Sequence, residues 1–203
     1  MLHRRSLFLA TTFVLAGALA PVQALPPPGG KLLKITPEIA AQNHPFKITM
    51  AVNGTFAMPA PGAGPDINGA MLHIADMGPS SATGVFIDLP AAQWTRRQSN
   101  TSLKYIYNGL VGFHPCTGVV TGSARWKLRC RGFTNFGAVT GTVGTPFSGT
   151  ARVELVFTGS GITLCQEFGG IERRNDATAL IRKKAPPTTS CSPSGAFIDA
   201  ELP

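Results

Sequence analysis

Apolar and polar residues alternate with a period of two along much of the chain. In the segment 46–52 (FKITMAV), every second residue from Phe46 to Val52 is apolar. Because successive side chains of a β-strand point to opposite faces, this pattern predicts a half-buried strand. Further strand-like runs occur at 31–35, 70–75, 84–89, 103–107, 118–122, 124–132, 150–157, 162–168 and 177–182.

The breaks between these runs predict the fold class. Gly, Pro, Asn or Ser stands at nearly every break, and the segment 65–69 (PDING) is typical of a turn. Only 36–44 could begin a helix, with Thr36 as N-cap and Pro37 at the first helical position. We therefore predict an all-β fold, an antiparallel β-sandwich of about ten short strands with little helix.

The composition agrees with short strands and many turns, since only 14% of the residues are charged and the chain contains 23 Gly and 17 Pro.

The first residues predict a cleaved secretory signal peptide, 1–24, with Arg4 and Arg5 before an apolar run and cleavage near Ala24. That run is shorter than the roughly 20 residues that span a bilayer, so we expect no transmembrane segment. The twin arginines leave both the general and the twin-arginine export routes open.

The expected organisation has one folded domain. We place a Pro/Gly leader at 25–30, a single β-sandwich domain at 31–191 and a C-terminal tail at 192–203. We expect a bacterial protein that is secreted to the periplasm or the exterior. Loss of the signal would lower the net charge from +8 to +6, which is modest for a nucleic-acid binder, and we expect no specific nucleic-acid partner.

All four cysteines lie in the exported part, and an even number there predicts disulfides. Of the three possible connectivities we favour Cys116–Cys130 and Cys165–Cys191, because each joins the nearest cysteines in sequence. No two cysteines have zinc-site spacing, so we expect no metal and no cofactor.

The strongest candidate for a binding surface is the segment 124–132 (ARWKLRCRG). On a strand, Arg125, Lys127, Arg129 and Arg131 would share one face, opposite Trp126 and its apolar neighbours. This row would span about 20 Å and could contact an anionic glycan or another cell-surface component. The alternative is a solvated strand face. A second basic cluster contains Arg173, Arg174, Arg182, Lys183 and Lys184, with Glu172 and Asp176 as counter-charges, and we expect these residues to be solvated turn charges.

Candidates for catalysis are few, and none of the common nucleophile, zinc-protease or phosphate-loop motifs occurs. We expect His73 to be an exposed strand residue and Glu154 to pair with Arg152 on one strand face. A hydrolase would need a cleft in which Asp88, Glu154, Glu167 or a histidine converge. We therefore predict no enzyme activity and assign no catalytic residues.

Several segments resemble a module of exported proteins from environmental bacteria. They include IDLPAAQW, LKYIYNG before PC, LRCRG, LCQEFGG and the ending KKAPPTTSC, and they cover about 31–191. Arg131 stands where the module has Lys, and Gln166 where it has Ala. The module has no assigned activity, so the resemblance implies architecture and export but no catalytic residues.

These observations predict an exported, non-enzymatic binding or structural domain at the cell exterior. One alternative is an adhesin-like or matrix subunit that assembles through strand edges, and a secreted hydrolase is a weaker one. Exposed rings of Trp94, Tyr105 or Tyr107 would favour ligand binding, and buried rings would favour a structural role. The oligomeric state stays open.

Overall fold

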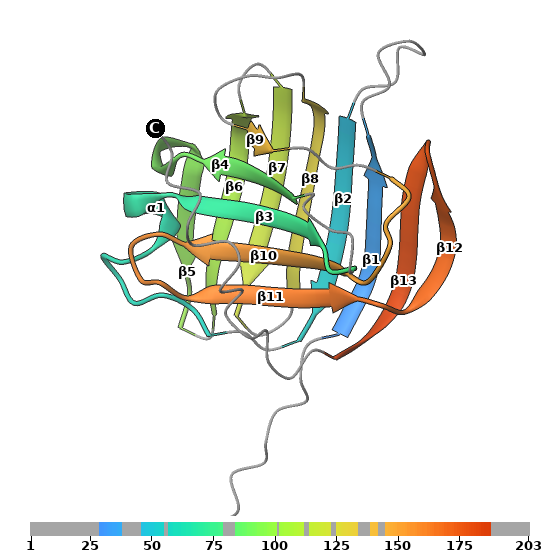
Figure 1. The fold of residues 1–203 in the computed structure, drawn as a ribbon. Coiled ribbons are helices and arrows are strands. Elements are labelled where there is room, and N and C mark those ends of the chain that lie inside the picture. The colour runs from blue at the N-terminus through green and yellow to red at the C-terminus, as the bar shows by residue number, and fades with distance from the viewer. Residues whose placement is uncertain are drawn as a thin grey trace, which may run out of the picture.

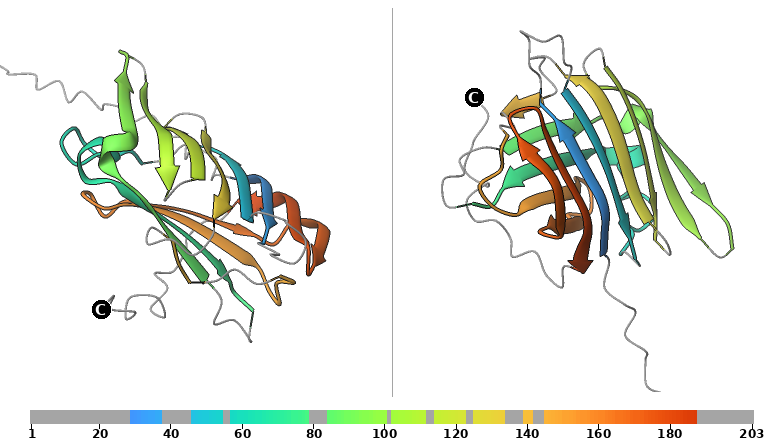
Figure 2. Two further views of the ribbon diagram at one scale, coloured as in Figure 1. Left: turned by 90° about the horizontal axis from the view of Figure 1, so that it is seen from above. Right: turned by 90° about the vertical axis from the view of Figure 1, so that its right-hand side faces the viewer.

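The computed structural model contains two antiparallel β-sheets that pack face to face. Figure 1 shows the strands of the smaller sheet running across those of the larger, and Figure 2 shows the sheets as two layers. This arrangement confirms the expected all-β sandwich. The structure describes residues 29–37, 46–54, 57–78, 84–100, 102–111, 114–122, 125–133, 139–141 and 145–187.

The larger sheet has eight strands, and each neighbouring pair is antiparallel. Their order is β12 (Ile171–Asp176), β13 (Ala179–Pro187), β1 (Gly29–Thr36), β2 (Phe46–Asn53), β8 (Arg125–Phe133), β7 (His114–Thr121), β6 (Leu103–Val111) and β5 (Trp94–Gln98).

The smaller sheet has five strands, again all antiparallel. Their order is β11 (Thr163–Phe168), β10 (Ala151–Phe157), β3 (Ala70–Asp76), β4 (Gly84–Leu89) and β9 (Val139–Gly141). Two short helices complete the described elements, α1 (Pro65–Asn68) and the 3-10 turn η2 (Ala91–Gln93). No helix among the described residues is long and apolar enough to cross a membrane.

The core lies between the sheets and is built from the apolar half of the alternating pattern. The larger sheet contributes Leu33, Ile35, Ile48, Met50, Val52, Tyr105, Tyr107, Trp126 and Leu128, and the smaller sheet Leu72, Ile74, Ile87, Val153, Leu155, Phe157 and Phe168, all at most 1% exposed. Each large apolar side chain buried in this way stabilises the fold by roughly 1.5–3 kcal/mol.

Three strands were not expected from the sequence: β5, β9 and β12. The reason is clearest for β5 and β12, which form the two edges of the larger sheet and bury little. Because backbone pairing rather than side-chain burial defines such strands, they carry no alternating signal. The β1 strand begins at Gly29, inside the expected leader, and includes Thr36.

The expected helix start falls mostly outside the described residues, and the Thr36 part of it is wrong. The strand expected at 118–122 begins earlier, at His114, so that Cys116 lies within β7. The segment 65–69, expected as a turn, forms one helical turn that ends at Gly69, where φ is +76° and glycine is favoured.

Candidate functional site

The basic row of the sequence lies on the outer side of β8. Arg125, Lys127, Arg129 and Arg131 are all exposed, whereas Trp126 and Cys130 are fully buried. The alternation predicted for this segment is therefore present, with the tryptophan facing the core. Pairing with β2 and β7 places the row near the middle of the eight-stranded sheet.

Cations from five other strands share this outer side. Lys47 lies directly opposite Arg131, and Arg97 lies directly opposite Lys104. Like charges that face each other across strands destabilise a sheet, so this arrangement carries an energetic cost. We call eight of these cations, on β1, β2, β5, β6 and β8, the cationic face; they are Lys34, Lys47, Arg97, Lys104, Arg125, Lys127, Arg129 and Arg131. Lys183 of β13 lies on the same side of the sheet, directly opposite Leu32.

Acidic residues are absent from the strands that form this face. None of β1, β2, β5, β6, β7 and β8 contains Asp or Glu. Within the described residues the carboxylates lie in α1, in the smaller sheet and in β12. No ion pair among the described residues involves a member of the cationic face. The described part of the chain therefore does not neutralise the positive charge of this surface through ion pairs.

The sequence contained a signal for this segregation that the strand-by-strand analysis missed. No Asp or Glu occurs between Asp88 and Glu154. Four strands of the larger sheet come from this stretch, so their outer side could only be neutral or cationic. Strand order then adds Lys34 and Lys47 from the N-terminal strands β1 and β2.

Two shallow hollows mark the boundary between β7 and β8 on the cationic face. One, of about 280 Å³, is lined by Pro115, Thr117, Arg129 and Arg131. The other, of about 270 Å³, shares Thr117 and Arg129 and extends along the strands to Val119 and Lys127. The hollows exist because the outward side chains of β7 are short beside the long cations of β8.

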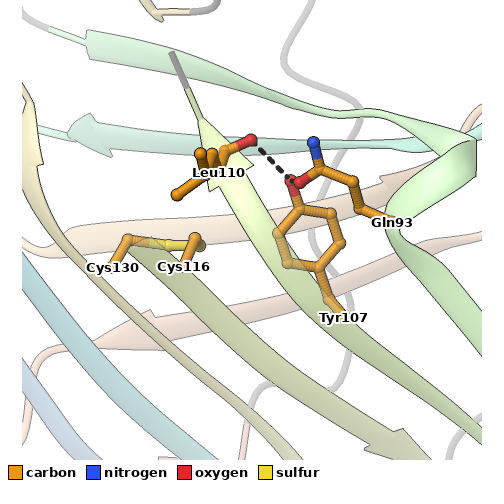
Figure 3. The surroundings of a disulfide bond; sticks show 5 residues. All are labelled: Gln93, Tyr107, Leu110, Cys116 and Cys130. Atoms are coloured by element: carbon orange, nitrogen blue, oxygen red, sulfur yellow. Dashed lines mark hydrogen bonds between the residues drawn. A yellow bond between two sulfur atoms is a disulfide. The ribbon is translucent and has the colours of Figure 1, made fainter. Parts of the chain in front are cut away.

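A buried disulfide joins the two strands beneath these hollows. Cys116 of β7 and Cys130 of β8 are bonded, as the sequence predicted, and both are fully buried (Figure 3). Nearby, the Tyr107 hydroxyl donates a hydrogen bond of 2.8 Å to Gln93 Oε1. Burial, with the Asp88 charge as the smaller cause, raises the pKa of Tyr107 far above its ordinary value.

The second predicted disulfide involves one residue outside the described ranges. Cys165 of β11 is disulfide-bonded, whereas Cys191 lies beyond the described residues, so the pairing of Cys165 with Cys191 stays a prediction.

The aromatic rings that could have formed a stacking platform are buried. Trp94 is 6% exposed, and Tyr105 and Tyr107 are fully buried. By the criterion set from the sequence, this burial counts toward a structural role of the protein and against a ligand site built on these rings. None of these three rings can stack on a ligand at the cationic face, which offers charge and hydrogen bonding instead.

His73 corrects a prediction, because it is buried rather than exposed. It lies on β3 in the middle of the smaller sheet, and only 2% of it is exposed. Its ring stacks on Phe86 at 4.2 Å between centroids, and Nδ1 lies 3.3 Å from Glu154 Oε2. Alternation identifies the face of a strand residue but not whether neighbours cover that face.

Two of the three acidic candidates for catalysis, Glu154 and Glu167, belong to one ion-pair network on the same sheet. Arg152 lies 3.7 Å from Glu154, as expected for this pair, and 2.7 Å from Glu167 on the neighbouring strand. One guanidinium therefore contacts both carboxylates. Asp88 is exposed on β4 and has no contact with either. No group of three or more potential metal ligands occurs among the described residues.

The second basic cluster is divided between surface and interior. Arg174 pairs with Asp176 at the surface, whereas Arg182 is only 6% exposed. Arg182 Nη1 donates to the carbonyl oxygens of Gly149 and Phe168, at 2.7 and 2.9 Å, and Nη2 lies 2.8 Å from Glu172. The expectation of solvated turn charges is therefore wrong for Arg182, which links the two sheets.

A hollow of about 340 Å³ beside Arg182 is lined in part by Glu172, Asn175 and Ser148, whose side chains are already hydrogen-bonded within the protein. Next to it, the Asp76 carboxylate accepts hydrogen bonds from the backbone N–H groups of Gly78, Ser148 and Gly149 and from the Ser148 hydroxyl. Burial would raise the pKa of Asp76, but these hydrogen bonds outweigh burial and hold the pKa below its ordinary value. We interpret this region as structural.

Comparison of the chain with protein-family models, with curated proteins and with solved structures gave no match.

Proposed function

We propose that this chain is an exported, non-enzymatic binding domain that contacts an anionic polymer or surface through its cationic face. The observation that carries the proposal is the segregation of charge: eight cations from five strands share one acid-free surface. A merely solvated face gains nothing from placing Lys47 opposite Arg131, since mixed charges would solvate it equally well and repel less.

The disulfide between Cys116 and Cys130 supports export from the cytoplasm. A disulfide in a bacterial protein requires an oxidising compartment, which the periplasm and the exterior provide. The N-terminal sequence predicts the route to that compartment. Outside the cell, anionic glycans and other charged surface components would be the available partners.

Assembly through strand edges receives less support. The edge strand β5 carries Arg96 and Arg97, and the opposite edge, β12, carries Glu172, Arg173 and Arg174. Charged side chains on an edge disfavour pairing with a second sheet.

The test compares retention of the oxidised mature protein on dextran sulfate and on neutral dextran, which share one backbone. Wild type should bind only the sulfated matrix, and salt of about 0.15 M should weaken the binding because it screens charges. The variant Arg125→Ser/Lys127→Ser/Arg129→Ser/Arg131→Ser should lose retention.

A matched control removes four cations from β12 and β13, at the far end of the larger sheet from Arg97 and Lys104, as Arg173→Ser/Arg174→Ser/Lys183→Ser/Lys184→Ser. It has the same net charge as the first variant, so it should keep most of its retention if the cationic face is responsible. Equal losses in both variants would indicate attraction by net charge alone. Absence of wild-type retention on every anionic matrix would refute the proposal.

A further inference from the structure

The outer side of β7 forms the floor of a linear depression on the cationic face. Its outward side chains are all short, whereas β8 beside it carries four long cations. We call this depression the β7 trough; Pro115, Thr117 and Val119 line its hollows, and Thr121 continues the same outward row of short side chains. The floor extends over about 20 Å at roughly 3.4 Å per residue.

The two hollows between β7 and β8 lie within this trough and join. Both are lined by Thr117 and Arg129, and together they extend from Pro115 to Val119. The trough therefore runs along the strands, parallel to the row of cations, rather than forming an isolated pit.

Register places hydroxyl groups and cations side by side. Thr117 lies directly opposite Arg129, and Thr121 lies directly opposite Arg125. A guanidinium can hold a carboxylate or sulfate with two hydrogen bonds, and a neighbouring hydroxyl can donate a third. Successive cations on β8 lie about 7 Å apart, so anionic groups that repeat along a chain could be held in sequence.

We propose that the β7 trough binds a linear acidic polysaccharide, with the sugar chain parallel to β7 and its sulfate or carboxylate groups against the cations of β8. This inference rests on the function proposed above and identifies the class of partner. A flat bilayer surface would touch only the tips of the long cations, whereas a narrow chain can reach the threonine hydroxyls on the floor.

Single-stranded nucleic acid fits the trough less well. Proteins that bind it stack bases on aromatic rings, and none of the described side chains that border the β7 trough is aromatic. The indole of Trp126 is fully buried on the opposite side of the sheet.

The test fills the trough without changing any charge. Thr117→Leu adds volume to the floor and removes a hydroxyl, and Thr95→Leu is the matched control at an exposed threonine of β5 on the same side of the sheet. The probes are heparin oligosaccharides from disaccharide to dodecasaccharide, measured by calorimetry, and vesicles of phosphatidylglycerol, measured by sedimentation. Thr117→Val, which removes only the hydroxyl, serves as a second variant should Thr117→Leu not fold.

Wild-type affinity should rise with oligosaccharide length until the chain spans about 20 Å, and then level off. Thr117→Leu should bind the long oligosaccharides roughly tenfold more weakly, since it removes a hydrogen bond to a charged group and obstructs the chain. Its vesicle binding should be unchanged, and Thr95→Leu should resemble wild type in both assays.

Two results would contradict polysaccharide binding in the β7 trough without contradicting the proposed function. One is that Thr117→Leu and Thr117→Val bind long oligosaccharides as tightly as wild type. The other is that wild type binds the vesicles but no oligosaccharide. Failure of wild type to bind either probe would instead remove the proposed function itself.

Discussion

Cys116 and Cys130 lie directly opposite each other in the β7–β8 ladder, and their disulfide is on the inner side of the sheet. The next pair in the ladder, Thr117 and Arg129, points to the outer side and lines both hollows. The covalent bond therefore fixes the register of the two strands that build the β7 trough. A slip by one residue would turn the cations of β8 toward the core.

Removal of this disulfide should destabilise the protein, but the variant should still fold. For Cys116→Ala/Cys130→Ala we expect the free energy of unfolding to fall by about 3 kcal/mol, because the bond closes a short loop in the unfolded chain. Urea unfolding followed by circular dichroism measures the change. An unchanged urea midpoint would show that the backbone hydrogen bonds between β7 and β8 hold these strands together without help from the disulfide.

Asp76 should make stability depend on acid pH. Asp76→Asn should lower the free energy of unfolding at neutral pH by about 1–3 kcal/mol, because a buried carboxylate that accepts four hydrogen bonds is lost. The pKa of Asp76 is lower in the folded state, so its stabilisation is present above the unfolded value of about 3.9 and is lost as pH falls through the folded value.

The difference in the free energy of unfolding between wild type and Asp76→Asn should accordingly shrink as pH falls below about 3.9. Urea unfolding across a pH series tests this, with Asp88→Asn, at an exposed strand position, as the control that should match wild type at every pH. A gap that persists unchanged into strong acid would contradict the role given to the Asp76 carboxylate.

Arg182 and Arg174 should differ sharply in their contribution to stability, although each pairs with an acidic side chain. The side chain of Arg182 is 7% exposed and that of Arg174 is 48% exposed. Arg182→Leu should cost about 1–3 kcal/mol for each of the two carbonyl oxygens that lose their donor, whereas Glu172, whose side chain is 45% exposed, can turn to water. Arg174→Leu should cost no more than about 1 kcal/mol. Similar thermal midpoints for the two variants would argue against a linking role for Arg182.

Lys47 should reveal a conflict between stability and binding on the cationic face. Lys47→Glu replaces a repulsive pair with Arg131 by an attractive one, so the free energy of unfolding should rise by about 0.2–1 kcal/mol. Retention on dextran sulfate should weaken in the same variant. The neutral variant Lys47→Gln should lie between wild type and Lys47→Glu both in the free energy of unfolding and in retention on dextran sulfate. Stronger retention of Lys47→Glu would oppose the proposed function.

The sequence by itself determined most strands, the direction of their side chains and one disulfide. Those features are local: a period of two assigns Trp126 to the core and Arg125 to the surface whatever the neighbouring strands are. The Cys116–Cys130 bond likewise joins cysteines that are close along the chain. The edge strands β5 and β12 escaped prediction because backbone pairing, which leaves no pattern in the side chains, defines them.

Only the tertiary structure decided which strands lie side by side. Strand order brings Lys34 and Lys47 from the N-terminal part next to the cations of β8, and it buries His73 between Phe86 and Glu154. It also turns Arg182, which looks like a surface charge in sequence, toward the carbonyl oxygens of Phe168 in the smaller sheet and of Gly149 just before β10. Contacts of this kind depend on register between segments far apart in the chain, and no local pattern encodes that register.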